Sequence, residues 1–212
     1  MSSRDAIFAS LRQNRPPGEH PLPDLRLFEV AHAGDLVAFF ETNLKAMGGK
    51  VFGAPASADL GGVVAQLYPD AKMVASATPE IRGNRNLGAV AHPRDLADVD
   101  VAVVRAAFAI AETGSVLLSD DALAVNSLAY LAQHLLVLLD PADIVASTQE
   151  AYRRPEMRAH HYAVFHTGPS ATADIEGVLI HGAQGVRSLT VIMRPRGLSS
   201  DPERGGATAA AF

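Results

Sequence analysis

This chain of 212 residues has no cysteine and no tryptophan, and only 6% of its residues are aromatic. Without cysteine it forms no disulfide, has no thiolate nucleophile and cannot ligate an iron–sulfur cluster through sulfur. We therefore expect no cofactor on this chain. If the protein works with an iron–sulfur cluster, a partner must supply it.

An excess of positive charge and a long hydrophobic run are also missing. The 18 basic residues are outnumbered by 23 acidic ones, so the net charge is −5, which argues against nucleic-acid binding. The longest apolar stretch, Val99–Ala111, contains Asp100 and Arg105 and is too short to span a bilayer. Met1–Arg15 lacks the apolar core of a signal peptide. We expect a cytoplasmic protein with no membrane span.

The composition favours one large domain with an appended arm. Hydrophobic residues make up 48% of the chain, enough to build a sizeable core. In the arm, residues 1–30, an amphipathic helix over Ser3–Asn14 precedes four prolines between positions 16 and 23. This helix either packs on its own domain or contacts a partner subunit, so a homo-oligomer is left open. The domain is predicted over residues 31–196 and a flexible tail over 197–212.

The hydrophobic pattern alternates between helical and strand periods, which is typical of an α/β fold with a parallel sheet. Helices are predicted over Asp35–Met47, Ala58–Tyr68, Pro141–Arg153 and Thr172–His181. Strands are predicted over Lys50–Phe52, Lys72–Ala75, Val99–Arg105, Ala107–Ala111, Val116–Leu118, Leu135–Leu139, Tyr162–His166 and Ser188–Met193. We expect Val99–Arg105, Leu135–Leu139, Tyr162–His166 and Ser188–Met193 to be buried in a central, mostly parallel sheet.

A first polar motif, Glu112-Thr113-Gly114-Ser115, lies between two predicted strands. Gly114 permits the positive φ angle of a tight turn. A glutamate beside two hydroxyls can act as a base, a nucleophile or a hydrogen-bond acceptor. Alternatively, the polar side chains only satisfy the backbone of a hairpin. The spacing leaves both interpretations open.

A second motif, Thr167–Glu176, follows a predicted strand and leads into a predicted helix. Free N–H groups and the helix dipole would make such a helix start an anion site. Ser170 and Thr172 would cap the helix or bind a carboxylate or phosphate. Asp174 and Glu176 would stabilise its first turn or contact the ligand. No lysine follows the glycine, so this loop is not a P-loop for nucleotide triphosphates.

Three histidines, His134, His166 and His181, lie at predicted strand or helix ends. With Glu112 or Asp174 they offer the ligand types of a metal site. None of them has the short ligand spacing of a known metal motif. We therefore predict no metal, and local hydrogen bonding for each histidine.

These segments resemble the lactate-utilisation protein C family, the LUD domain. Ala111–Ser115 matches its pattern Ala-Glu-Thr-Gly-(Thr/Ser), and Thr167–Glu176 matches Thr-Gly-Pro-Ser-x-Thr-Ala-Asp-Ile-Glu. Asn126–Asp140, with its Gln133-His134 step, is also similar. The family pattern Gly-x-His-Gly-Pro falls on positions 182–186, where this chain has Gln184 in place of histidine. Glutamine does not titrate near neutral pH, so the difference favours a binding role.

The resemblance implies a three-layer α/β/α fold with a mostly parallel sheet, of the NagB/RpiA/CoA-transferase-like type. It also implies a subunit of a multi-protein system that oxidises L-lactate to pyruvate, with iron–sulfur clusters on partner proteins. In this interpretation the chain binds a small anionic ligand and Glu112 is the candidate catalytic residue. The candidate ligand-binding residues are Thr113, Gly114, Ser115, His134, Thr167, Gly168, Pro169, Ser170, Thr172, Asp174, Glu176 and Gln184.

Two alternatives come from other functional classes. One is an independent acyl/CoA transferase or isomerase acting on small anionic metabolites, with Glu112 as nucleophile or base. The other is a regulatory protein that binds a metabolite and performs no chemistry. All three interpretations require the two motifs to converge on one pocket.

Overall fold

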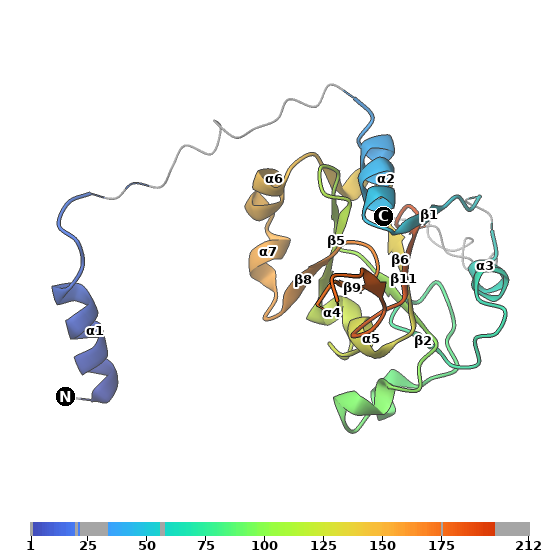
Figure 1. Ribbon diagram of the computed structural model, residues 1–212, viewed down its shortest axis with the longest axis horizontal. Helices are drawn as coiled ribbons and strands as arrows, with labels where there is room; N and C mark the ends of the chain where they lie inside the picture. The colour runs from blue at the N-terminus through green and yellow to red at the C-terminus, as the bar shows by residue number, and fades with distance from the viewer. Residues whose placement is uncertain (1, 20, 22–33, 56–57, 175, 198–212) are drawn as a thin grey trace, which may run out of the picture.

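The computed structural model describes residues 2–19, 21, 34–55, 58–174 and 176–197. At its centre lies a five-stranded sheet in which all neighbouring strands are parallel (Figure 1). In spatial order its strands are β1 (Lys50–Phe52), β11 (Ser188–Met193), β6 (His134–Leu139), β3 (Val101–Arg105) and β2 (Val74–Ser76). The three middle strands are mostly buried apolar residues, as expected for a parallel sheet covered on both faces.

A second sheet of four strands packs against the first. Its order is β7 (Ile144–Val145), β4 (Ala109–Ile110), β5 (Ser115–Ser119) and β8 (Ala163–His166). Strand β5 is antiparallel to both β4 and β8. Val116 and Leu118 on one face of β5 share a hydrophobic cluster with Val104 and Val137 of the central sheet. Period-two alternation thus directs one face of β5 to the main core and the other to an outer cluster around Leu117.

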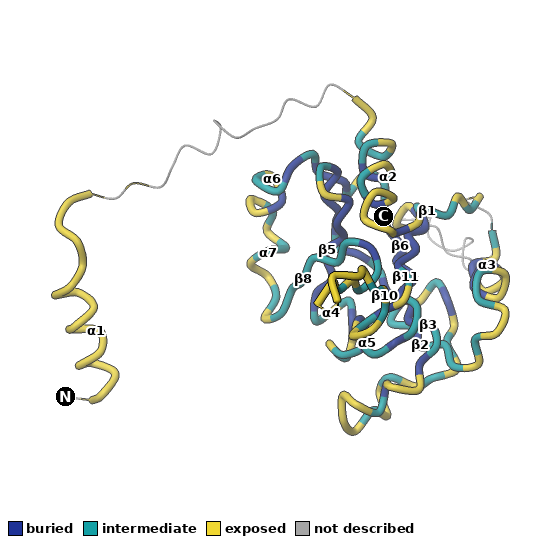
Figure 2. Tube along the Cα trace, in the orientation of Figure 1, coloured by how far each residue is buried: buried dark blue, intermediate teal, exposed yellow. Residues whose placement is uncertain are grey.

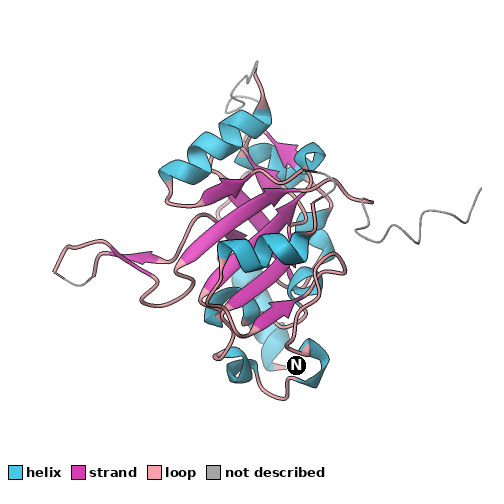
Figure 3. Ribbon diagram, turned by 90° about the vertical axis from the view of Figure 1, so that its right-hand side faces the viewer, coloured by secondary structure: helices cyan, strands magenta, loops and turns pink. Residues whose placement is uncertain are grey.

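Helices pack against both sheets (Figure 3). α3 (Leu60–Leu67) packs on one face of the central sheet, and α2 (Leu36–Ala46) packs on the other. The short helices α4 (Asp120–Leu123) and α5 (Leu128–Leu131) join the cluster of α2. α6 (Thr148–Arg153) and α7 (Glu156–Ala159) contribute to the outer cluster of the second sheet. Three short 3₁₀ turns are η2 (Leu87–Ala89), η3 (Pro93–Leu96) and η4 (Pro141–Asp143).

Aspartates fix where the two main helices begin. The carboxylate of Asp35 accepts the Val37 N–H at 2.9 Å, and that of Asp59 accepts the Gly61 N–H at 3.0 Å. These bonds satisfy N–H groups that have no partner within the helix. With its start fixed, α2 directs Phe40 and Leu44 into the core.

The predicted α/β class and the mostly parallel sheet are confirmed, but three predicted segments are wrong. Tyr162–His166 does not lie in the central sheet, because β8 pairs antiparallel with β5 and is only half-buried. Pro141–Arg153 is not one helix. It forms η4, then β7, then α6, because the β-branched pair Ile144 and Val145 extends alongside β4.

The predicted helix Thr172–His181 is also wrong. The segment forms a hairpin of β9 (Ala171–Thr172) and β10 (Ile180–His181) that projects from the domain (Figure 3). Glu176 and Gly177 have φ angles of 55° and 70°, a left-handed conformation that ends any right-handed helix. Therefore no helix follows Ser170, and the anion site based on a helix dipole is lost.

The amino-terminal helix α1 (Ser3–Gln13) confirms the predicted amphipathic helix. None of its residues is buried, and Figure 2 shows it exposed along its length and apart from the domain. Most of the predicted linker, residues 20 and 22–33, lies outside the described residues, as do residues 198–212 of the predicted tail.

Across the described part of the chain, every helix is too short or too polar to cross a bilayer.

Candidate functional site

The two sequence motifs meet in the structure. In the antiparallel register of β5 and β8, Val116 is opposite His166, which places Ser115 beside Thr167. Ser115 Oγ lies 2.5 Å from Thr167 Oγ1, and Thr113 Oγ1 donates to Ser115 Oγ over 2.8 Å. A chain of three hydroxyls therefore joins the turn at Glu112–Ser115 to the loop at Thr167–Ser170.

The end of α2 packs against the glycines of both motifs. Gly114 and Gly168 have φ angles of 67° and 70°. A Cβ on Gly114 would collide with the backbone N of Leu44, and one on Gly168 would collide with the carbonyl oxygen of Met47. Both positions thus require glycine for conformation and for space. Asn43 Nδ2 also donates to the Ala111 carbonyl over 2.8 Å, which ties α2 to the first motif.

A cavity of about 340 Å³ lies beside the second motif. Its lining consists of Ala129, Tyr130, Val164–Ala171 and Gln184–Val186. Ser170 shapes one wall, since its N–H donates to the Val186 carbonyl at 2.9 Å and its hydroxyl donates to the Gln184 carbonyl at 3.1 Å. The lining therefore includes five of the predicted ligand residues: Thr167, Gly168, Pro169, Ser170 and Gln184.

Two lining residues that sequence reasoning did not select are Tyr130 and His166. Their ring centroids are 5.2 Å apart, and the Tyr130 hydroxyl contacts that of Tyr162. His166 Nε2 is buried with no hydrogen-bond partner among the described residues. His166 is the last residue of its strand and comes directly before Thr167, so its place in the sequence could have identified it as a candidate site residue. Nothing in the sequence marks Tyr130.

The cavity is polar but uncharged. Burial lowers the pKa of His166 to about 4, so the imidazole is neutral at pH 7. Burial and the Tyr162 hydroxyl raise the pKa of Tyr130 to about 12. No lysine, arginine, aspartate or glutamate lines this cavity. A neutral imidazole of such low pKa is a poor base, so the arrangement favours binding and orientation over proton abstraction.

The carboxylate of Glu112 is engaged by the first residue of α6. Its Oε1 accepts the Thr148 N–H at 2.6 Å and the Thr148 hydroxyl at 2.5 Å. Thr148 is the first residue of α6, where a negative charge is favourable. Glu112 is also absent from the cavity lining. The carboxylate therefore stabilises the start of a helix.

The other predicted ligand residues lie away from this cavity. Thr172, Asp174 and Glu176 belong to the projecting hairpin, where Thr172 Oγ1 donates to Asp174 Oδ2 over 2.9 Å. His134 lines a separate cavity at the amino edge of the central sheet. Thr113 and Ser115 contact the loop at Thr167–Ser170 through the chain of hydroxyls, and Gly114 packs against α2.

Within the described ranges, a metal-like group of side chains is formed by Asp120, Asp121 and His160, whose ligand atoms lie within 4.8 Å of one another. His160 Nδ1 is 3.2 Å from Asp120 Oδ1 and 3.3 Å from Asp121 Oδ2. These contacts already make a histidine–carboxylate network at the start of α4. The group does not include His134, His166 or His181.

Comparison with known proteins adds a family and a fold. Residues 89–193 match the family model of the LUD domain, and this range contains both motifs and the whole cavity lining. No curated protein matches the sequence. Among solved structures, the chain is similar to the crystal structure of a DUF162 family protein from Deinococcus radiodurans. The two share 17% identity with a TM-score of 0.57, over 75% of this chain and 96% of that one. At this identity the similarity shows the fold alone.

Proposed function

We propose that this chain, which belongs to the LUD domain family through residues 89–193, is a ligand-binding component of a system that oxidises L-lactate to pyruvate. The LUD domain indicates a lactate-utilisation-related protein. One observation carries the finer proposal: the second family motif lines one polar cavity, and the hydrogen bond between Ser115 and Thr167 joins the first motif to that lining. The cavity is the proposed binding site for the hydroxy acid or the oxo acid.

The lining chemistry suits such a ligand. L-Lactate and pyruvate each carry a carboxylate and one further oxygen, as a hydroxyl or a carbonyl. The side chains of Thr167, Ser170 and Gln184 offer hydroxyl and amide groups to these oxygens. A buried nitrogen without a partner, such as His166 Nε2, is costly, and a ligand that reaches it would remove that cost. Most ligand pockets likewise combine apolar walls with a few polar groups.

In this proposal the electrons leave through another protein. Conversion of L-lactate to pyruvate releases two electrons and two protons, and this chain has no cysteine to ligate an iron–sulfur cluster. We propose that partner proteins with iron–sulfur clusters accept the electrons, while this chain binds the small acid.

A genetic and biochemical experiment tests this role. Deletion of the gene from its host should abolish growth on L-lactate, and the wild-type gene should restore it. Tagged protein from lactate-grown cells should co-purify with an iron–sulfur protein that has its characteristic visible absorption. Normal growth of the deletion strain on L-lactate, with no such protein recovered, would remove the proposal.

A further inference from the structure

A second cavity, of about 430 Å³, lies where the strands of the central sheet begin. Lys50, His134 and Ser188 are the first residues of β1, β6 and β11, and all three line it. Because these strands are neighbours in the parallel sheet, their first residues gather along one edge. Arg187 and Asp100, each one position before a strand, also line the cavity.

The two cations of this cavity have no carboxylate partner. Among the described residues, neither Lys50 nor Arg187 forms a salt bridge, and both are exposed. Asp100 is engaged elsewhere, because its Oδ2 accepts the N–H groups of Lys72 at 2.7 Å and Met73 at 2.8 Å. These two bonds lower the pKa of Asp100 and hold its charge against the backbone.

His134 is held in a defined position beside the cations. Its Nδ1 lies 2.8 Å from Ser188 Oγ, and its ring stacks on Tyr68 with centroids 4.8 Å apart. Tyr68 is fixed in turn, since its hydroxyl lies 3.0 Å from Thr190 Oγ1. With Nδ1 engaged, Nε2 is the nitrogen left for a ligand. Burial, and then the positive charges of Arg187 and Lys50, lower the pKa of His134, with Asp100 opposing them.

We infer that this amino-edge cavity is a binding site for a small anion, with Lys50 and Arg187 neutralising its carboxylate or phosphate group and His134 hydrogen-bonding it. Lys50 and Arg187, neither of them in a salt bridge among the described residues, line this cavity together with the carboxylates of Asp70 and Asp100, whereas no lysine or arginine lines the first cavity. Charge-assisted hydrogen bonds from lysine and arginine are the usual means of holding such groups.

The same two chain segments line both cavities. Gln184–Val186 line the first, and Arg187 and Ser188 line the second. Ala129 and Tyr130 line the first, and Gln133 and His134 the second. The Arg187 N–H donates to the Gln133 carbonyl over 2.8 Å and joins the two segments between the sites. The anion site is therefore separate from the proposed acid-binding cavity but adjacent to it.

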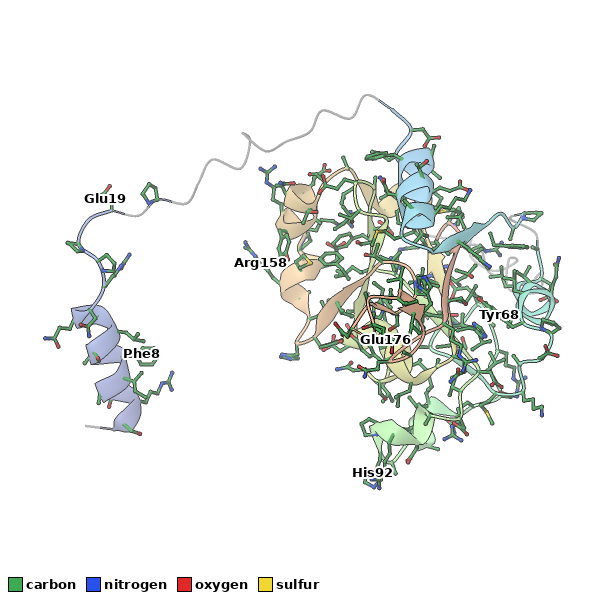
Figure 4. All side chains as sticks on the ribbon, viewed as in Figure 1. Phe8, Glu19, Tyr68, His92, Arg158 and Glu176 are labelled. Carbon is green, nitrogen blue, oxygen red and sulfur yellow. The ribbon has the colours of Figure 1, made fainter. Side chains whose placement is uncertain are left out.

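The test is calorimetric titration of the full chain with inorganic phosphate and, separately, with malonate. We expect at least one anion to bind, and Lys50→Gln and Arg187→Gln each to weaken it roughly tenfold through loss of one charge-assisted hydrogen bond. Tighter phosphate binding would assign a phosphorylated ligand, and tighter malonate binding a carboxylate. Arg158→Gln is the matched control, because it removes one positive charge from an exposed position on the side of the domain opposite Tyr68 (Figure 4).

A second measurement needs no variant. A bound anion adds negative charge beside His134, so the NMR titration curve of its imidazole should move to higher pH in the presence of the anion that binds. The exposed His161 serves as the internal control. The proposal is overturned if neither anion binds at tens of millimolar, if both cavity variants bind as the wild type does, or if the His134 curve stays in place. L-Lactate binding at the first cavity is measured separately, and its result does not decide whether the second cavity binds an anion.

Discussion

Ser115 and Thr167 are 52 positions apart in the sequence, and their hydroxyl oxygens lie 2.5 Å apart. The register of β5 and β8 brings them together, and the end of α2 packs over both of their loops. The wall of the candidate site therefore depends on sheet pairing and helix packing, not on either loop alone.

The hydroxyl pair should give a measurable coupling energy. Ser115 is only 5% exposed, so Ser115→Ala leaves the Thr167 hydroxyl without its partner in a largely dry place. We expect Ser115→Ala and Thr167→Val each to lower the free energy of unfolding by about 1–2 kcal/mol. The double variant should lose about 1 kcal/mol less than the sum, as measured by urea unfolding. Strictly additive losses would mean that the contact carries no energy of its own.

Packing of α2 on the first motif can be isolated with two glycines. Gly114 and Gly177 have φ angles of 67° and 70°, but only Gly114 faces a close neighbour, the backbone of Leu44. Gly177→Ala should therefore cost only the left-handed conformation, roughly 1–2 kcal/mol. Gly114→Ala should cost a further 1–3 kcal/mol or so from overpacking. Equal losses in thermal or urea unfolding would contradict the close approach of α2.

Glu112 should matter for stability and not for ligand binding. Removing its carboxylate by Glu112→Ala breaks two hydrogen bonds to Thr148 and should cost about 1–2 kcal/mol of unfolding free energy. Glu112→Gln keeps an acceptor oxygen and should cost less. Both variants should bind L-lactate and pyruvate like the wild type. If Glu112→Gln folds normally but fails to bind, Glu112 belongs to the ligand site and the transferase or isomerase alternative gains support.

Stability should fall in mildly acidic solution because of His166. Its pKa is lowered from 6.5 to about 4 in the folded chain, so the unfolded chain takes up a proton first as the pH falls. The free energy of unfolding should therefore drop between pH 6.5 and 4, by up to about 3 kcal/mol, and this contribution should level off below pH 4. The lowered pKa of His134 acts in the same direction.

The variant His166→Gln isolates this contribution. The difference between wild type and His166→Gln in urea unfolding should shrink, or reverse sign, as the pH is lowered from 7 through the window set by the pKa of His166. Parallel pH profiles for the two proteins would show that His166 is not buried in its neutral form.

The sequence predicts best those elements whose residues leave few alternatives. The apolar run at Leu135–Leu139 becomes most of β6, and Ser188–Met193 is β11 without change. The helix predicted over Asp35–Met47 is found as α2, with Asp35 as its N-cap. Local signals of this kind identify elements reliably because they arise within the element itself.

The misassigned segments depend on partners distant in the sequence. Tyr162–His166 resembles a central strand, but pairing with β5 places it in the second sheet. Thr172–His181 has helix-like spacing, and only the turn at Glu176 and Gly177 makes it a hairpin.

The residues of the candidate site could likewise be predicted from the sequence only in part. The loop at Thr167–Ser170 and Gln184 could be selected from motifs, whereas Tyr130 reaches the cavity only through tertiary packing.

The central claim is that the cavity beside Thr167–Ser170 binds the small acid, and calorimetry with L-lactate and pyruvate tests it most directly. The wild-type chain should bind at least one of them. His166→Gln should weaken binding roughly tenfold by removing a lining hydrogen-bond group, while His161→Gln, at an exposed histidine, should leave it unchanged. Absence of binding by the wild type, or equal affinity in all three proteins, would contradict the account.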